Sequence, residues 1–181
     1  MKNLLVTVLA IILLFGCNAS IHKPADGKST PLVLRDGILY ADSTAKVPFT
    51  GRNKSKALDQ FVEYDVVNGI KEGDFIIYYP NQKVQMAGKM SNNKNVGEWK
   101  YYNPDGSLET IGNYVDDKPS GTWTWYYPNG KIAEEGNYKE GKRDCKWKTY
   151  DTTGSQIIIR MYKEEKLIDS TLVKEDDKTT K

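Results

Sequence analysis

Histidine and cysteine, from which many catalytic and metal sites are built, are scarce in this sequence. Its 181 residues include one histidine, His22, and two cysteines, Cys17 and Cys145. A zinc site needs a cluster of such ligands, nucleophilic catalysis needs a base beside the nucleophile, and many phosphate sites use a glycine-rich loop. The sequence contains none of these patterns. We therefore expect a protein that is not an enzyme and that uses no metal or cofactor.

An excess of charge of one sign is also missing. The chain has 26 Lys and Arg residues against 24 Asp and Glu residues, mixed along its length. Nucleic-acid binding depends on a basic surface that neutralises phosphates, so we expect no nucleic-acid partner. Neighbouring acidic residues diverge in a strand or turn, and we interpret three such pairs as aids to solubility: Asp116/Asp117, Glu134/Glu135 and Glu164/Glu165.

No apolar run is long enough to span a bilayer. The longest, Leu4 to Phe15, follows a short basic start, and a membrane-spanning helix needs roughly 20 residues. The run is typical of a signal peptide, which we place at residues 1–16. Residues 17–31 are polar, contain His22 and two prolines, and are expected to form a flexible tether in which the histidine has no chemical role.

The end of this run, Leu14-Phe15-Gly16-Cys17, resembles the lipobox of bacterial lipoproteins. The resemblance implies cleavage before Cys17, a lipid on that cysteine, and anchoring in a membrane of the bacterial cell envelope. Asn18 favours the outer membrane if the organism is Gram-negative. The alternative is an ordinary secretory signal followed by a chance cysteine.

Four ungapped copies of a 24-residue unit follow a divergent start at 32–72; they cover 73–96, 97–120, 121–144 and 145–168. Such a period indicates an array made by duplicating one supersecondary unit. Aligned columns contain Phe75, Trp99, Trp123 and Trp147; Tyr78, Tyr102, Tyr126 and Tyr150; Gly88, Gly112 and Gly136; and Met90, Tyr114, Tyr138 and Tyr162.

Each copy is predicted to be one β-hairpin. In the third copy two β-prone runs flank Tyr127-Pro128-Asn129-Gly130, in which proline presets the first corner and glycine supplies the positive φ that closes a turn. Helical periodicity is absent and turns recur too often for helices. We therefore predict an all-β fold, an elongated twisted antiparallel sheet of hairpin repeats. A connection over 115–120 is expected to join the second copy to the third.

Alternation along the strands divides the aligned columns of the repeat between the two faces of the sheet. With a four-residue loop, Trp99 lies opposite Gly112 and Gly97 opposite Tyr114, and an indole folded over a neighbouring glycine would close the gap in the sheet. Simple packing or positive φ is the alternative explanation of the glycines. The predicted core comprises Phe75, Trp99, Trp123, Trp147, Gly112, Gly136, Tyr114 and Tyr138.

The opposite face carries the second aromatic column, Tyr78, Tyr102, Tyr126 and Tyr150. These tyrosines form either a cross-strand ladder that stiffens the sheet or an exposed strip that binds a partner. We take them as the candidate binding surface.

The last copy departs from the pattern. Cys145 replaces a column glycine and Arg160 replaces another. With Cys17 lipidated, Cys145 has no partner in the chain, so it is either a tolerated small residue or one end of an intermolecular bridge. We expect 166–168 and 172–173 to cap the array and the charged end of 169–181 to be disordered.

Several of these motifs together, Gly-x-Trp-x-x-Tyr, Pro-Asn-Gly and Glu-Gly-Asn-Tyr-Lys-Glu-Gly-Lys, resemble the variant MORN repeat of the YwqK-like antitoxin family. The resemblance covers residues 47–168 and is specific in the two middle copies. It implies a sheet of hairpins with a binding or scaffold role. Three functions follow as hypotheses: a protein-binding scaffold, a glycan- or peptidoglycan-binding module, and, from the family alone, an antitoxin or immunity protein.

Overall fold

The fold is an open row of β-strands. The computed structural model describes residues 32–57 and 60–173, and all its regular elements are strands. A first hairpin joins β1 (Val33–Arg35) to β2 (Ile38–Tyr40) through the predicted turn at Asp36-Gly37. In these ranges we find no helix long and apolar enough to cross a membrane.

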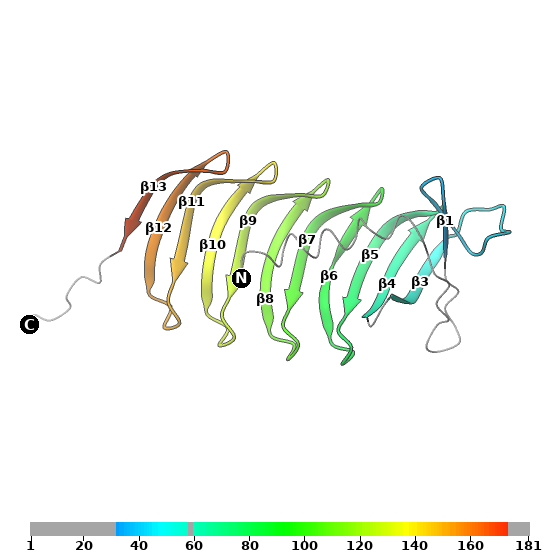
Figure 1. Cartoon of the computed structure of the whole chain (residues 1–181), viewed down its shortest axis with the longest axis horizontal. Helices are drawn as coiled ribbons and strands as arrows, with labels where there is room; N and C mark the ends of the chain where they lie inside the picture. The colour runs from blue at the N-terminus through cyan, green and yellow to red at the C-terminus, as the bar shows by residue number, and fades with distance from the viewer. Residues whose placement is uncertain (1–31, 58–59, 174–181) are drawn as a thin grey trace, which may run out of the picture.

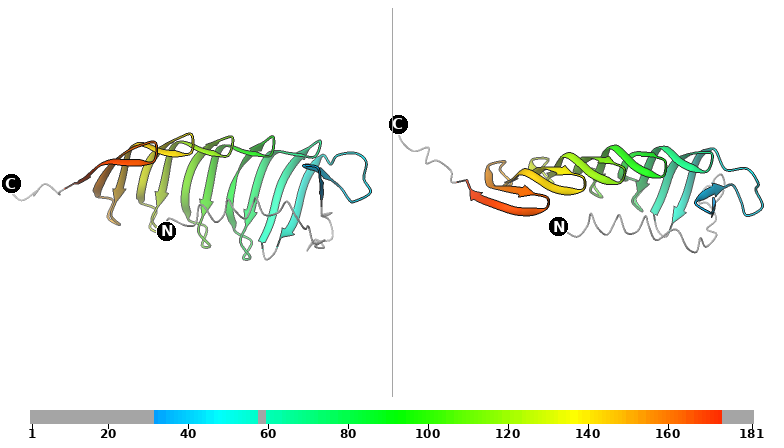
Figure 2. Two further views of the ribbon diagram at one scale, coloured as in Figure 1. Left: turned by 45° about the horizontal axis from the view of Figure 1, so that its top comes forward. Right: turned by 90° about the horizontal axis from the view of Figure 1, so that it is seen from above.

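The other eleven strands form one antiparallel sheet, in which neighbours in sequence are neighbours in space (Figure 1). The predicted all-β sheet of MORN-type hairpins is confirmed, and its twist is visible in Figure 2. The strands are β3 (Gly51–Ala57), β4 (Gln60–Val67), β5 (Ile70–Tyr78), β6 (Val84–Ser91), β7 (Lys94–Tyr102), β8 (Leu108–Val115), β9 (Lys118–Tyr126), β10 (Ile132–Lys139), β11 (Lys142–Tyr150), β12 (Gln156–Lys163) and β13 (Lys166–Leu172).

Within a copy, the strands pair in the predicted register. Trp99 lies opposite Gly112 and Gly97 opposite Tyr114. The turn is one residue tighter than expected, because the Asn103 N–H donates to the Ser107 carbonyl at 2.9 Å. A bulge at Glu109, where the register shifts between Tyr101 and Tyr102, compensates for the shorter loop.

Between copies, the connection expected over 115–120 is wrong. β8 runs to Val115 and β9 begins at Lys118, so only Asp116 and Asp117 form the turn, with φ of 48° and 66°. Positive φ at both central residues is the type I′ geometry, which matches strand twist. Asp117 also accepts a hydrogen bond from the Asn95 N–H at 2.8 Å, so this acidic pair has a structural role beyond solubility.

A bulge recurs where one copy meets the next. Ile111 pairs with Thr124 but Asn113 pairs with Ser120, so Gly112 alone faces residues 121–123. Gly121, at the start of the bulge, has φ of 69°, a conformation that favours glycine. The equivalent Cys145 has φ of 58° and takes this conformation with a side chain, at a cost in backbone strain.

The tryptophan column is completely buried. Trp99, Trp123 and Trp147 are each 0% exposed, although the sheet is a single layer. A Cβ added to Gly112 would lie 2.1 Å from Cδ2 of Trp123. The indole that covers a glycine therefore comes from the following copy. Trp99 pairs with Gly112 but covers Gly88, because the bulge swings each indole toward the preceding strand.

The glycine column stops where the tryptophan column stops. Eleven residues separate Gly112 from Trp123, and the same spacing links Arg160 to Thr171. Because Thr171 has no indole, position 160 can carry a side chain. At the other end Tyr64 occupies this column and stacks on Phe75, with ring centroids 5.8 Å apart. In this column, glycine occurs only at the positions that an indole covers.

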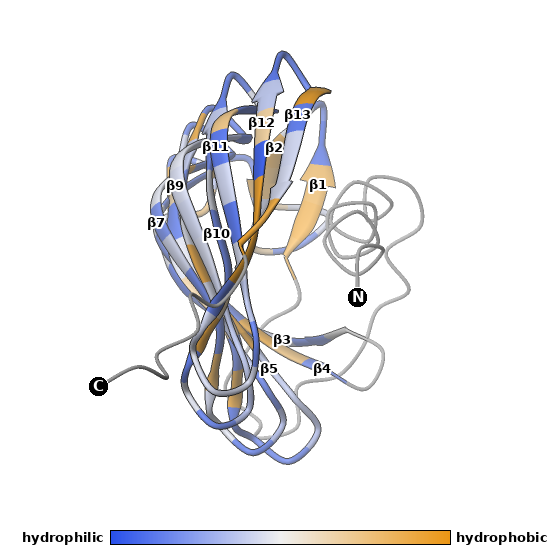
Figure 3. Ribbon diagram, turned by 90° about the vertical axis from the view of Figure 1, so that its left-hand side faces the viewer, coloured by the Kyte–Doolittle hydropathy of each residue, from blue (hydrophilic) through white to orange (hydrophobic). Residues whose placement is uncertain are grey.

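Aromatic contacts then continue along this face. Tyr114 and Tyr138 contact Trp123 edge to face, with centroids 5.2 and 5.9 Å away, the geometry that aromatic pairs prefer. The Tyr101 and Tyr114 hydroxyls are 3.0 Å apart, and burial raises the pKa of Tyr101. Figure 3 shows apolar segments within the strands and hydrophilic residues at the turns. We call the surface of the sheet that carries Trp99, Trp123 and Trp147 the indole face.

Candidate functional site

The four candidate tyrosines lie in a row on the other surface, here called the tyrosine face. Each is the last residue of its strand: Tyr78 of β5, Tyr102 of β7, Tyr126 of β9 and Tyr150 of β11. All four are half-buried. One strand separates each from the next, which gives a spacing of about 9–10 Å. The structure therefore brings them together as an evenly spaced strip beside the hairpin turns.

The last tyrosine of the strip is held by a polar network. The Tyr150 hydroxyl donates to Oε1 of Glu135 at 2.7 Å, and the Lys148 ammonium donates to the same oxygen at 2.8 Å. The hydrogen bonds from Lys148 and Tyr150 keep the pKa of Glu135 below its usual value. Glu135 was predicted to serve only solubility. It instead ties β10 to β11, the strands of two neighbouring copies.

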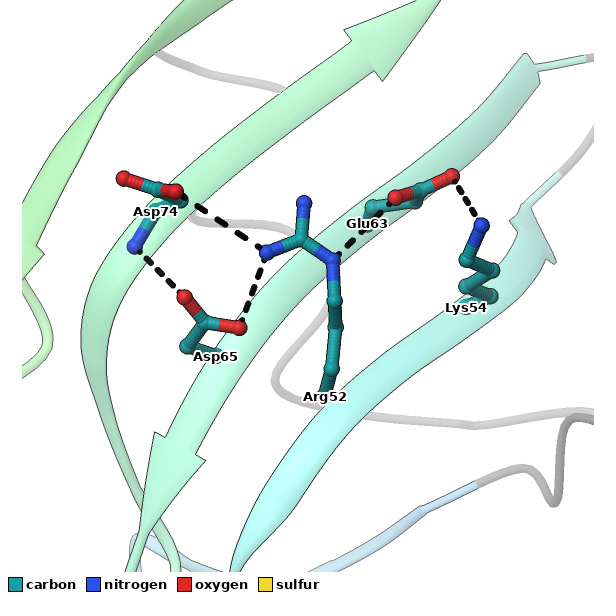
Figure 4. A network of polar contacts seen from close by, with 5 residues as sticks. All are labelled: Arg52, Lys54, Glu63, Asp65 and Asp74. Atoms are coloured by element: carbon teal, nitrogen blue, oxygen red, sulfur yellow. Dashed lines mark hydrogen bonds and ion pairs between the residues drawn. The ribbon is translucent and has the colours of Figure 1, made fainter.

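The first tyrosine adjoins a similar but larger network (Figure 4). Arg52 contacts Oε2 of Glu63 at 3.2 Å and Oδ1 of Asp65 at 2.9 Å, and Lys54 contacts Oε1 of Glu63 at 2.8 Å. Burial raises the pKa of Tyr78, and the Glu63 carboxylate adds to that rise. Figure 4 shows Arg52 reaching from β3 across β4 toward Asp74 of β5.

This network serves the edge of the sheet. The side chains of Arg52 and Lys54 are 36% and 56% exposed, so solvent weakens both ion pairs. Burial favours the neutral form of Glu63, but hydrogen bonds from Lys54 and Arg52 dominate and hold its pKa below the usual value. Glu63 and Asp65 of β4 therefore hold the cations Arg52 and Lys54 along β3, the edge strand.

Tyr150 is the one tyrosine of the strip whose hydroxyl makes a hydrogen bond among the described residues. Among residues 32–57 and 60–173, no hydrogen bond is found for the hydroxyl of Tyr102 or Tyr126. Tyr102 pairs with Leu108 of β8, and Ile111 lies on the same face further from the turn, between Lys100 of β7 and Thr124 of β9. We call Tyr102, Ile111 and Tyr126 the central patch. It combines two aromatic rings, one aliphatic side chain and two free polar tips.

A half-buried carboxylate lies next to the central patch. Glu109 is the bulged residue beside Tyr102, and burial raises its pKa. No cation pairs with it within the part of the chain that the structure describes. A carboxylate in this position can accept hydrogen bonds from a ligand. Neither Ile111 nor Glu109 was singled out from the sequence, because the bulge that places Glu109 there leaves no mark in the alternation.

On the indole face Trp99, Trp123 and Trp147 are fully buried, and the partly buried rings of Tyr101, Trp125 and Tyr138 pack against the same core. Cations lie over its two ends. Lys71 is 5.2 Å from the centroid of the Tyr64 ring, and Arg143 is 4.2 Å from that of Trp147. Such cation–π contacts stabilise the ends of the aromatic stack. This face is therefore core.

Some predicted features lie outside the described residues: Cys17 with residues 1–16, the tether at 17–31 including His22, and residues 174–181. Cys145 is a free, exposed thiol. In the ranges that can be described, we find no group of three or more His, Cys, Asp and Glu residues arranged to hold a metal ion.

Hairpins that recur every 24 residues and share one open sheet define the chain as a β-hairpin repeat protein. Residues 95–116 and 119–140 match the family described as MORN repeat variant. Apart from residues 95 and 96, these segments fall in the two middle copies, where the resemblance is most specific, and they support a repeat scaffold or binding module.

Other comparisons add little. The search of curated proteins gave no match. Among 28 matching chains of known structure is one from the crystal structure of the GtfA/B complex bound to UDP and GlcNAc, at 13% identity and a TM-score of 0.20. The match covers 61% of this chain and 19% of that chain. So low a score supports no conclusion about fold or ligand.

Proposed function

We propose that this protein is a non-enzymatic, lipid-anchored scaffold of the bacterial cell envelope that binds a protein partner on its tyrosine face. The observation that carries the proposal is the evenly spaced tyrosine strip, whose central members Tyr102 and Tyr126 make no hydroxyl hydrogen bond among the described residues. The MORN-type repeats agree with a binding role.

The chemistry of the central patch suits a protein. Tyrosine is enriched at protein interfaces because its ring buries a large area while its hydroxyl still bonds. Around the two rings, Ile111, Lys100 and Thr124 supply apolar, cationic and hydroxyl groups within one small area. A mixed surface of this kind matches the apolar core and polar rim of an ordinary interface.

Anchoring is the second part of the proposal. Cys17 carries the lipid, and residues 17–31 separate the membrane from the sheet. Replacing Cys17 by serine is expected to move the protein from the membrane fraction to the soluble fraction. Metabolic labelling with a fatty acid should mark the wild-type chain and leave the Cys17→Ser chain unlabelled. A labelled Cys17→Ser chain would refute anchoring at this residue.

Cross-linking in intact cells tests the binding surface. The Tyr102→Ser/Tyr126→Ser chain should lose a partner that the wild type captures, because the interface loses both rings. Lys118→Ser/Lys142→Ser is the matched control: it alters two exposed residues beside the connecting turns. Unchanged capture by the tyrosine variant, or equal loss in the control, would contradict a site on the tyrosine face.

A glycan is the second candidate, and the spacing of the strip supports it. Rings repeated every 9–10 Å or so could stack on successive sugars of an extended polymer. Titration with peptidoglycan fragments and envelope polysaccharides should then change tyrosine fluorescence in the wild type but not in Tyr102→Ser/Tyr126→Ser. No response to any sugar would eliminate this candidate. An antitoxin or immunity role is supported by the family resemblance alone.

A further inference from the structure

The last strand of the sheet, β13, has an unprotected edge. All seven of its residues are exposed, and Leu167, Ile168 and Leu172 are 54%, 62% and 73% exposed. β12 pairs with one side of β13, and no strand of the described residues lies along the other. An open edge with apolar side chains readily pairs with another strand.

The opposite edge differs in character. β3 carries Arg52 and Lys54, both partly exposed and held in the acidic network of Figure 4. Cations along an edge strand disfavour pairing with another chain. β13 has only Lys166, at its first position, and a bulge at Ile168 against β12, so its Ser170–Leu172 end carries no charge that would oppose pairing.

β13 is also an incomplete repeat. It begins 24 residues after β11, which begins at Lys142, but it has Thr171 where β11 has Trp147. β5, β7, β9 and β11 each pair with a strand on both sides, whereas among the described strands β13 pairs with β12 alone. In each complete copy an even-numbered strand pairs with the far side of the odd-numbered strand. No described strand occupies that place beside β13.

The residues along this edge are symmetric in polarity about Ser170. Two apolar residues precede a polar trio, and two apolar residues follow it: Leu167, Ile168; Asp169, Ser170, Thr171; Leu172, Val173. Two copies of one strand that pair antiparallel across a two-fold axis place a residue opposite itself. A palindromic pattern of this kind is therefore complementary to itself.

Register follows from that symmetry. With the axis at Ser170, Asp169 faces Thr171 of the other copy; if the outer edge runs on regularly past Ile168, which is bulged on its β12 side, then Ile168 faces Leu172 and Leu167 faces Val173. Opposed apolar pairs and carboxylate–hydroxyl pairs stabilise a sheet, whereas like charges directly opposite destabilise it. Moving the axis by one residue to Asp169 would oppose two carboxylates.

We propose that β13 pairs with β13 of a second copy of this chain, antiparallel about Ser170, so that one sheet continues through both copies. The contact uses the same patch on both partners and leaves no open β13 behind, so it closes at two copies. The polar β3 edges lie at the far ends of the combined sheet.

Disulfide trapping tests the contact on the full chain in intact cells. Ser170→Cys is introduced together with Cys145→Gly, and a thiol oxidant is added before non-reducing electrophoresis. A band of twice the chain mass is expected, because Ser170 faces its own copy across the axis. Cys145→Gly alone controls for Cys17, and Lys54→Cys in the same background probes the β3 edge; neither should form the band.

Charge variants then test the register. Leu172→Lys and Ile168→Glu each place a charge opposite an aliphatic side chain of the other copy, and each should abolish trapping through Ser170→Cys. Both changes together oppose lysine to glutamate twice and should restore it. The altered side chains are already 62% and 73% exposed, so circular dichroism should show an intact sheet in every variant.

Three results would overturn the proposal. They are absence of the band with Ser170→Cys, trapping that survives Leu172→Lys, and failure of the double variant to recover. A ladder of higher masses when Ser170→Cys and Lys54→Cys are combined would instead show β13 pairing with β3. A cross-linked band of another mass would identify a different protein as the occupant. Both of these outcomes also contradict the two-fold contact.

Discussion

Adding a single methyl group at Gly112 should destabilise the array strongly. In Gly112→Ala the new Cβ would lie 2.1–2.6 Å from three atoms of the Trp123 indole. The indole has no room to move, because it is 0% exposed and packs between Tyr114 and Tyr138. Overpacking of this kind costs about 1–3 kcal/mol.

A displaced indole would also lose its hydrogen bond. The Trp123 Nε1–H donates to the Asn113 carbonyl at 3.1 Å, and losing such a bond costs about 1 kcal/mol. The two effects together predict a loss of about 2–4 kcal/mol in the free energy of unfolding. Asn113→Ala, an exposed change in the neighbouring residue that keeps this carbonyl, is the control and should cost under about 0.5 kcal/mol.

A double-mutant cycle separates the clash from other effects of alanine. Trp123→Ala alone should cost about 3–5 kcal/mol, because it removes a fully buried indole. In that background Gly112→Ala should cost almost nothing, since the obstructing ring is gone. Urea unfolding followed by circular dichroism measures all four chains, with transition slopes compared because repeat arrays can depart from two-state behaviour. Equal costs of Gly112→Ala in both backgrounds would refute the contact.

Four further predictions follow from the described contacts. Cys145→Gly should raise the free energy of unfolding by about 0.5–1 kcal/mol, because φ of 58° suits glycine; a lower urea midpoint would contradict this. Tyr127→Phe should cost about 0.5–1.5 kcal/mol, because the Tyr127 hydroxyl donates to the Tyr150 carbonyl at 2.7 Å; an unchanged urea midpoint would argue against a stabilising role for this hydrogen bond. Glu63→Gln should cost up to about 1 kcal/mol at neutral pH. Since the folded pKa of Glu63 is lowered, its contribution is present above its ordinary pKa, and the two urea midpoints should converge as pH falls through the folded pKa. Burial raises the pKa of Tyr64 to about 12, so its contribution is complete below about pH 10 and is lost as pH rises toward 12; midpoints against pH should fall less steeply in Tyr64→Phe.

The strand register within a copy was predictable from the sequence. Alternation placed Trp99 and Tyr102 on different faces, and turn chemistry around Pro104 limited the loop to a few residues. A side-chain period of two then allowed only one arrangement that buries the indoles. These signals are local, and each lies within a single 24-residue copy.

The contacts between copies were not predictable in the same way. Which glycine each indole covers depends on the bulge at Gly121, and alternation alone cannot reveal two extra residues on one strand. The pair Asp116-Asp117 lacks the glycine that usually indicates a type I′ turn, so the connection was placed in a loop.

The difference between Tyr150 and the central tyrosines of the strip could not be predicted from the sequence either. Tyr150 bonds to Glu135, and Glu135 meets Lys148 across the boundary between the third and fourth copies. Only the register between copies shows that Tyr150 is hydrogen-bonded while Tyr102 and Tyr126 are not. The sequence columns made all four look equivalent.

The constant separation of each indole from its glycine also lets the array change length safely. Removing residues 97–120 would join 96 directly to 121 and leave Trp123 eleven positions after Gly88, the spacing that Trp99 had before. A whole copy can thus be lost or gained without creating a mismatched glycine or an uncovered ring. A deletion that falls between a glycine and its indole breaks that match unless it removes whole copies, so lineages carrying such arrays should differ there in size by steps of 24 residues.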